Sequence, residues 1–212
     1  MEPVVSCDPN EMQSMIIETI ITTIDPQETL NIAPMGPSFS DNFPWHDPID
    51  HFFELRPFEP STTLDNLQAT ACGVMNITDD VLLIAKAALN ELATLEVPVT
   101  PTQKIHGWHL AQACRCYEFT TSSFRQEGNR WMVNCKIVNV IQQRPMHGFN
   151  RAMFAVIEAA ILATRIDWLP EDEVQRQLSD LQSLVAKTGG PREKEAWAFV
   201  TQWIQSRTPQ QP

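Results

Sequence analysis

The chain has 212 residues, of which 43% are hydrophobic and 19% charged, and its formal net charge is -11. This length and composition suit one sizeable domain, or a domain with an appendage, around an ordinary apolar core. Binding to nucleic acid or to anionic membranes without specificity needs a basic surface, so we expect neither as a partner of this acidic chain.

The first residues and the cysteines predict a cytoplasmic protein. Residues 1–7 lack the basic region and the apolar stretch of a secretory signal, and no apolar run in the chain is long enough to span a bilayer. The five cysteines are then most simply free thiols in a reducing compartment. Cys114 and Cys116 have no second cysteine pair to complete a zinc site, so we expect buried apolar thiols and no metal.

The first part of the chain predicts an arm followed by a β-hairpin. Residues 1–12 have the composition of a loose arm. Residues 15–24 are rich in isoleucine and threonine, and β-branched residues favour a strand. A turn containing Asp25 and a proline follows, and residues 29–35 return as a second strand.

The next segment alternates irregular and regular structure. Residues 37–48 combine prolines with aromatic residues and are expected to form an irregular loop, long enough to be a lid or a partner-binding element. Residues 49–56 predict a third strand, residues 63–71 a short helix, and residues 72–77 a fourth strand.

The middle of the chain predicts a helix and a long hairpin. An acidic, hydroxyl-containing start and an apolar run predict a helix over residues 78–89. Residues 94–105 contain two prolines and are expected to be a connector. Residues 108–124 and 130–140 predict two strands joined by a turn.

The last part of the chain predicts three helices, over residues 149–165, 170–187 and 192–206. A largely antiparallel sheet with this number of strands tends to curl or close into a barrel. The predicted fold class is therefore α+β, mainly antiparallel β, with a barrel domain over residues 1–145 and a helical region over residues 146–212.

Two adjacent residues at the start of the first of these helices allow two interpretations. Asn150 is a suitable N-cap, so Asn150 and Arg151 can simply begin a helix. Alternatively, Arg151 contacts a ligand or pairs with Glu158. The residues themselves favour the ordinary helix start.

The segment from Arg56 to Asp65 points to an anionic ligand. Arg56 precedes a proline-rich turn, Ser61, Thr62 and Thr63 lie where the helix begins, and Thr62 with Asp65 has the spacing of a capping box. A helix N-terminus offers unpaired backbone N–H groups and a partial positive charge, so these residues predict a phosphate site. The alternative is that the hydroxyl groups only cap the helix.

The order of these motifs resembles the FMN-binding split barrel of the flavin reductase-like superfamily. The resemblance is carried by residues 31–36, 55–57, 61–67 and 73–77. That superfamily has a lysine at the helix start, where this chain has Ser61, so Arg56 must carry more of the phosphate charge. Within the superfamily, the chain is similar to an uncharacterised group, a domain of unknown function with an added helical region. This similarity covers residues 16–80, 149–152, 155–158, 161–165 and 187–197.

The resemblance implies FMN as cofactor and a homodimer whose two barrels build the site together. It places the flavin against the following residues: Asn31, Met35, Gly36, Arg56, Ser61, Thr62, Thr63 and Asn66. It suggests an oxidoreductase supplied by a donor such as a reduced nicotinamide, but it names no catalytic residue and does not distinguish FMN from a deazaflavin. Two alternatives stay open: a non-catalytic flavin-binding or sensing protein, and a split barrel that has lost flavin and acts in assembly.

Overall fold

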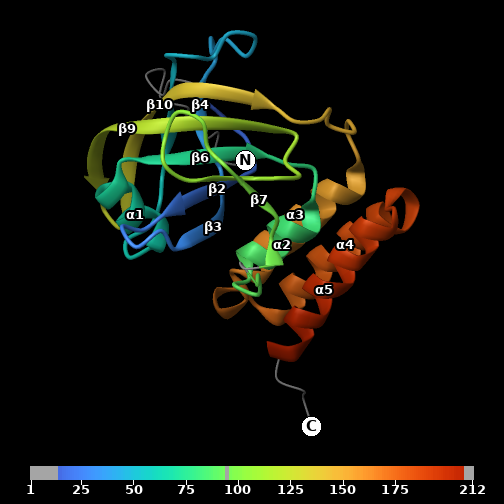
Figure 1. The fold of residues 1–212 in the computed structure, drawn as a ribbon. Coiled ribbons are helices and arrows are strands. Elements are labelled where there is room, and N and C mark those ends of the chain that lie inside the picture. The colour runs from blue at the N-terminus through green and yellow to red at the C-terminus, as the bar shows by residue number, and fades with distance from the viewer. Residues whose placement is uncertain (1–13, 94–95, 208–212) are drawn as a thin grey trace, which may run out of the picture.

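Eight strands form one curled antiparallel sheet (Figure 1). The computed structural model describes residues 14–93 and 96–207. The strands lie in the order β1-β4-β5-β10-β9-β6-β2-β3, and each neighbouring pair is antiparallel. Their bounds are β1 (Ser14–Ile16), β2 (Thr19–Ile24), β3 (Leu30–Met35), β4 (Ser38–Ser40), β5 (Phe52–Leu55), β6 (Cys72–Ile77), β9 (Arg115–Glu127) and β10 (Arg130–Gln142).

The two edges of the sheet approach each other where β3 passes into β4. Only Gly36 and Pro37 separate these strands, although β3 forms one edge of the sheet and β4 lies next to the other. The Ile17 amide donates to the Pro37 carbonyl at 3.2 Å, and Thr19 Oγ1 donates to the Met35 carbonyl at 2.9 Å. The sheet is therefore a barrel that is split at this corner, which confirms the predicted fold class.

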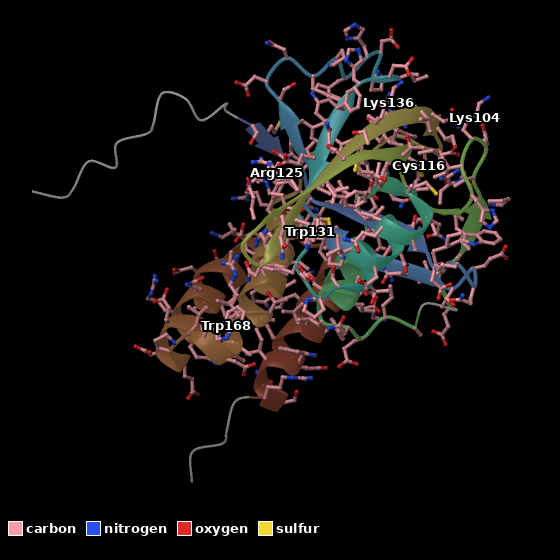
Figure 2. The ribbon with its side chains drawn as sticks, turned by 90° about the vertical axis from the view of Figure 1, so that its left-hand side faces the viewer. Lys104, Cys116, Arg125, Trp131, Lys136 and Trp168 are labelled. Carbon is pink, nitrogen blue, oxygen red and sulfur yellow. The ribbon has the colours of Figure 1, made fainter. Side chains whose placement is uncertain are left out.

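A two-stranded ribbon and five α-helices complete the described part of the chain. The ribbon consists of β7 (Val99–Pro101) and β8 (Trp108–Leu110), and Figure 2 shows Lys104 at its outer tip. Helix α1 packs against β2 and β3 at the barrel, whereas the other four helices form a layer of their own (Figure 1). The helices are α1 (Thr62–Thr70), α2 (Val81–Ala88), α3 (Arg151–Ala163), α4 (Glu171–Thr188) and α5 (Pro191–Arg207).

The barrel and the helical layer have separate cores. Leu64 and Leu67 of α1 pack inside the barrel with aromatic and β-branched residues such as Phe119. In the helical layer, Leu82 of α2 shares one apolar cluster with Val200 of α5 and with buried residues of α3 and α4. Helix α2 comes before the last strands of the barrel in the chain, so this second core contains residues from both sides of the predicted boundary at residues 145 and 146. The domain boundary itself stays a prediction.

The carboxylates of Asp79 and Asp80, which lie between β6 and α2, each bind an arginine from later in the chain. Both guanidinium nitrogens Nη1 and Nη2 of Arg144, in the connector after β10, donate to Asp79. At the start of α5, Arg192 Nη2 donates to Asp80 Oδ2 at 2.7 Å. The Arg144 hydrogen bonds outweigh burial and lower the pKa of Asp79 from 3.8 to about 2.

Most predicted elements are confirmed, including the hairpin of β2 and β3, helix α2 and the three C-terminal helices. Asn150 is the N-cap of α3, with its side chain accepting from the Ala152 amide, which confirms the ordinary helix start. Buried free thiols are confirmed at Cys114 and Cys116. The predicted arm over residues 1–12 lies outside the described residues.

Two predicted continuous strands are wrong. The β-branched run over residues 15–24 is interrupted at Ile17 and Glu18 because the chain changes partners: β1 pairs with β4, whereas β2 pairs with β3 and β6. The predicted strand over residues 108–124 is also interrupted, because β8 pairs with β7 before β9 joins the main sheet.

Smaller corrections concern the segments around these strands. The loop predicted over residues 37–48 contains the short strand β4, and the strand predicted over residues 49–56 is shortened to β5. The connector predicted over residues 94–105 includes β7. Strands β4 and β5 pair with partners distant in sequence, which local composition does not reveal. Strand β7 pairs with the nearby β8 across a short loop.

Candidate functional site: a groove between the barrel and helix α3

A groove of 1560 Å³ runs between the split corner of the barrel and helix α3. Its barrel side is formed by the ends of β3 and β5, the start of α1, and alternate residues of β10. Its other side is formed by one face of α3 together with Ile84 and Ala88 of α2. The groove therefore joins segments that are about 100 residues apart in the chain.

The start of α1 lies on this groove. Ser61 is the N-cap: its Oγ accepts from the Leu64 amide at 3.3 Å and its carbonyl accepts from the Asp65 amide at 3.1 Å. The predicted capping box with Thr62 as cap is wrong, because the extended backbone continues through Ser61 and Thr62 is already helical. These bonds leave the first-turn amides of Thr62 and Thr63 for an external anion.

Arg56 provides positive charge close to this helix start. Its guanidinium lines the groove, and Nε donates to Glu54 Oε1 at 2.7 Å. The side chain is 51% exposed, so its terminal nitrogens face solvent. An exposed ion pair of this kind is weak, and a phosphate dianion can compete for the guanidinium.

A buried hydrogen-bond network fixes α1 against the hairpin. Asn31 Nδ2 donates to Thr63 Oγ1 at 3.0 Å and to Thr23 Oγ1 at 3.2 Å. Asn66 Nδ2 donates to the same Thr23 oxygen at 3.0 Å. Both amide side chains thus lie behind the groove wall and position Thr63, which is on the wall.

The eight residues predicted for the site therefore fall into two groups. Five of them line the groove: Met35, Gly36, Arg56, Ser61 and Thr63. The other three do not: Asn31 and Asn66 lie behind the wall, and Thr62 is exposed at the helix start. Direct contact between these eight residues and a flavin stays a prediction.

Gly36 allows a close approach at the split corner, because the side chain of Ile16 lies against its backbone. A Cβ atom at Gly36 would lie 2.6 Å from Ile16 Cγ2 and 3.8 Å from Glu18 Oε1. A larger residue would push into the groove or displace β1. The corner thus keeps a flat stretch of backbone along the groove.

Several groove residues were missed from the sequence. Arg130, Met132 and Asn134 line it from β10, and their spacing of two opposite the buried Val133 and Cys135 is a signal that could have revealed them. The Arg130 guanidinium lies 3.9 Å from the centroid of the Phe58 ring, a cation–π contact.

Glu18 was also missed, because it lies in the interruption between β1 and β2. Its carboxylate lines the groove. Burial, together with the negative charge of Glu158 on α3, raises the pKa of Glu18 above its usual value. No local sequence signal brings these two carboxylates together.

Within residues 14–93 and 96–207, no cluster of three or more histidine, cysteine, aspartate or glutamate residues could hold a metal ion. Over the same residues, no helix is both long and apolar enough to cross a membrane.

Comparison with known proteins identifies the family. A family model described as "Protein of unknown function (DUF447) N-terminal domain" matches residues 17–144, and a second, "Protein of unknown function (DUF447)", matches residues 150–202. The chain belongs to the DUF447 family. The two matches together span the barrel and most of the helical layer of this DUF447 chain.

Two solved structures of proteins described as FMN-bound or FMN-binding share the fold of this chain. The chain is similar to an FMN-bound protein of Methanosarcina mazei that carries the same family description, with a TM-score of 0.73, 22% identity, and coverage of 91% of this chain and 96% of that one. An FMN-binding protein from Thermus thermophilus, crystallised with 1-cyclohex-2-enone, has a TM-score of 0.51 and 12% identity over 68% of this chain and 80% of that one. Because the two sequences are only 22% and 12% identical to this chain, the likeness establishes the fold alone.

Proposed function

We propose that the chain binds FMN in the groove and acts as a flavin-dependent oxidoreductase, with a substrate that is not established. The observation that carries the proposal is the start of α1 on the groove wall, with two free first-turn amides beside Arg56. Helix N-termini with an adjacent arginine are suited to a phosphate dianion. The FMN-bound protein of Methanosarcina mazei, which shares the fold, supports this assignment.

The groove residues fit the parts of FMN. Arg56, Ser61 and the amides of Thr62 and Thr63 would hold the phosphate, with Asn31 and Asn66 fixing Thr63 and the helix from behind. Met35 and the open backbone at Gly36 would lie along the flat ring. When bound, FMN supplies the redox chemistry, and the protein supplies position and electrostatics.

We further propose that the functional unit is a homodimer. Apolar side chains are exposed beside the groove, with Ile16 62%, Phe52 46% and Phe58 49% exposed. Exposed apolar patches next to a binding site are typical of protein interfaces, so a second copy would cover them and close the groove.

The buried free thiols of the described residues suit a reducing cytoplasm.

The first test is the visible spectrum of the purified protein, followed by release and mass analysis of any chromophore. Flavin absorption with the mass of FMN supports the proposal. A colourless protein that also fails to bind added FMN overturns it and leaves the flavin-free assembly role. A deazaflavin mass would correct the cofactor.

A second measurement separates an enzyme from a flavin carrier. The FMN-loaded protein is mixed with a reduced nicotinamide, and oxidation is followed by absorbance with and without added acceptors. Sustained turnover supports the oxidoreductase. A bound flavin that no donor reduces supports the non-catalytic binding or sensing protein.

A further inference from the structure

The groove is larger than one ligand needs. Ligand pockets are commonly about 300–1,000 Å³, whereas this groove measures 1560 Å³. The phosphate end proposed above uses barrel residues alone. The space along α3 is therefore available for a second molecule next to the flavin.

The α3 side of the groove is an apolar strip that ends in a cation. Ile157, Ile161 and Thr164 follow one another at spacings of four and three, which places them on one face of the helix, and Ala160 lets that face approach closely. Arg165 lies just beyond the helix end and also lines the groove. Such a strip suits a molecule with an apolar body and an anionic end.

Arg165 is free to bind an anion. In the described residues no carboxylate lies within ion-pair distance of its guanidinium, whereas Arg56, Arg144 and Arg192 each pair with one. An uncommitted arginine beside an apolar surface, in a chain with net charge -11, is suited to bind a carboxylate through two parallel hydrogen bonds.

The opposite end of the strip repels anions. Glu18 lines the groove near Gly36, and Glu158 on α3 is close enough to raise its pKa in addition to the effect of burial. Glu158 and Arg165 are seven residues apart, which is about 10 Å along a helix. A bound acid would therefore direct its carboxylate to Arg165 and its apolar part toward the split corner.

We propose that the α3 side of the groove is the substrate subsite and that it takes a planar, apolar monocarboxylate anchored by Arg165. This inference rests on the proposed FMN site, because the flavin would form the facing wall. Arg165 acts here as the residue that selects charged over neutral molecules of the same shape.

The test uses the FMN-loaded protein and two probes of equal shape, benzoate and the neutral benzamide. Each is titrated while the flavin absorbance is followed, in the wild type, in Arg165→Gln and in Arg151→Gln. Arg151 is a matched control, since it is an exposed arginine at the opposite end of α3 and does not line the groove. FMN affinity and thermal unfolding are measured for all three proteins.

We expect the wild type and Arg151→Gln to bind benzoate at least about tenfold more tightly than benzamide, as a charge-assisted pair would give. Arg165→Gln should lose this preference while its FMN affinity stays unchanged. Equal binding of the two probes by the wild type, or a preference that survives in Arg165→Gln, overturns the subsite but leaves the FMN site intact. Failure of the wild type to bind FMN overturns both.

Discussion

Two polar regions of the molecule differ in how completely their groups are satisfied. Under the β7–β8 ribbon, the fully buried Glu118 accepts from the amides of Gln103 and Lys104, both at 2.7 Å, and from His109 Nε2 at 3.0 Å. Thr100 Oγ1 lies 3.0 Å from the other ring nitrogen of His109. Each partner in this region is provided by the chain itself.

The groove shows the opposite arrangement. Arg165 has no carboxylate partner among the described residues, Arg130 lies over an aromatic ring, and Arg56 keeps terminal nitrogens in solvent. The exposed apolar residues Ile16, Phe52 and Phe58 line the same groove. Polar groups that satisfy one another maintain the fold, whereas groups left without partners beside apolar surface indicate a ligand site.

The largest effect is expected for Glu118→Ala. The substitution leaves the buried His109 and the amides of Gln103 and Lys104 without their acceptor, so we expect a loss of about 3–5 kcal/mol in the free energy of unfolding. Urea denaturation measures it. Glu127→Ala on the same strand, whose side chain is 44% exposed, is the control and should change stability by less than about 1 kcal/mol. Equal losses of stability in Glu118→Ala and Glu127→Ala would contradict a structural role for the Glu118–His109 pair.

A second substitution in the same region is Asn76→Ala. Asn76 Nδ2 donates to the Ile20 carbonyl and to Thr22 Oγ1, both at 3.1 Å, and Oδ1 accepts from the Leu110 amide at 2.9 Å. Its removal should cost about 2–3 kcal/mol, because several buried groups lose partners. Asn42→Ala, at an exposed residue of the loop after β4, serves as the control in the same denaturation series. If Asn76→Ala lowered the free energy of unfolding by less than about 1 kcal/mol, this would contradict a stabilising role for the hydrogen bonds of Asn76.

The Asp79–Arg144 pair predicts a specific dependence on pH. Because the pKa of Asp79 falls from 3.8 unfolded to about 2 folded, its contribution is complete above the unfolded value and disappears as the pH falls toward 2. The shift corresponds to about 2 kcal/mol. In Arg144→Gln, stability should be lower at pH 6 and should fall less steeply between pH 4 and pH 2. If the free energy of unfolding depends on pH in the same way in the wild type and in Arg144→Gln, the Asp79–Arg144 pair is not the source of that dependence.

The smallest effect on stability, and the clearest on binding, is expected in the groove. Arg56→Gln should weaken FMN binding by about tenfold or more, since a charged hydrogen bond to phosphate is lost. The free energy of unfolding should change by no more than about 0.5 kcal/mol, as for other surface substitutions. Flavin fluorescence titration and urea denaturation measure the two quantities. Unchanged FMN affinity would remove Arg56 from the site.

The sequence reveals the parts of this fold that depend on local signals. The run of β-branched threonine and isoleucine residues predicts the hairpin of β2 and β3, and the Ser61–Thr63 cluster predicts the start of α1. It does not reveal the interruption at Glu18, because the β-branched run continues through it while the strand changes partners. Arg165 was missed for a similar reason: an apolar helix face is visible in the sequence, but the surface it faces is not.

The wall that α3 contributes to the groove also concerns how such a chain can evolve. The family is described by two separate regions of sequence, over residues 17–144 and 150–202, yet the groove has residues from both. A lineage that changed only the groove-facing residues of α3 would keep the core that α2 shares with α3 and α5 and would alter that wall of the groove. Diversification of substrates among relatives is therefore expected to concentrate in the second region, while the proposed phosphate site is expected to be inherited with the first.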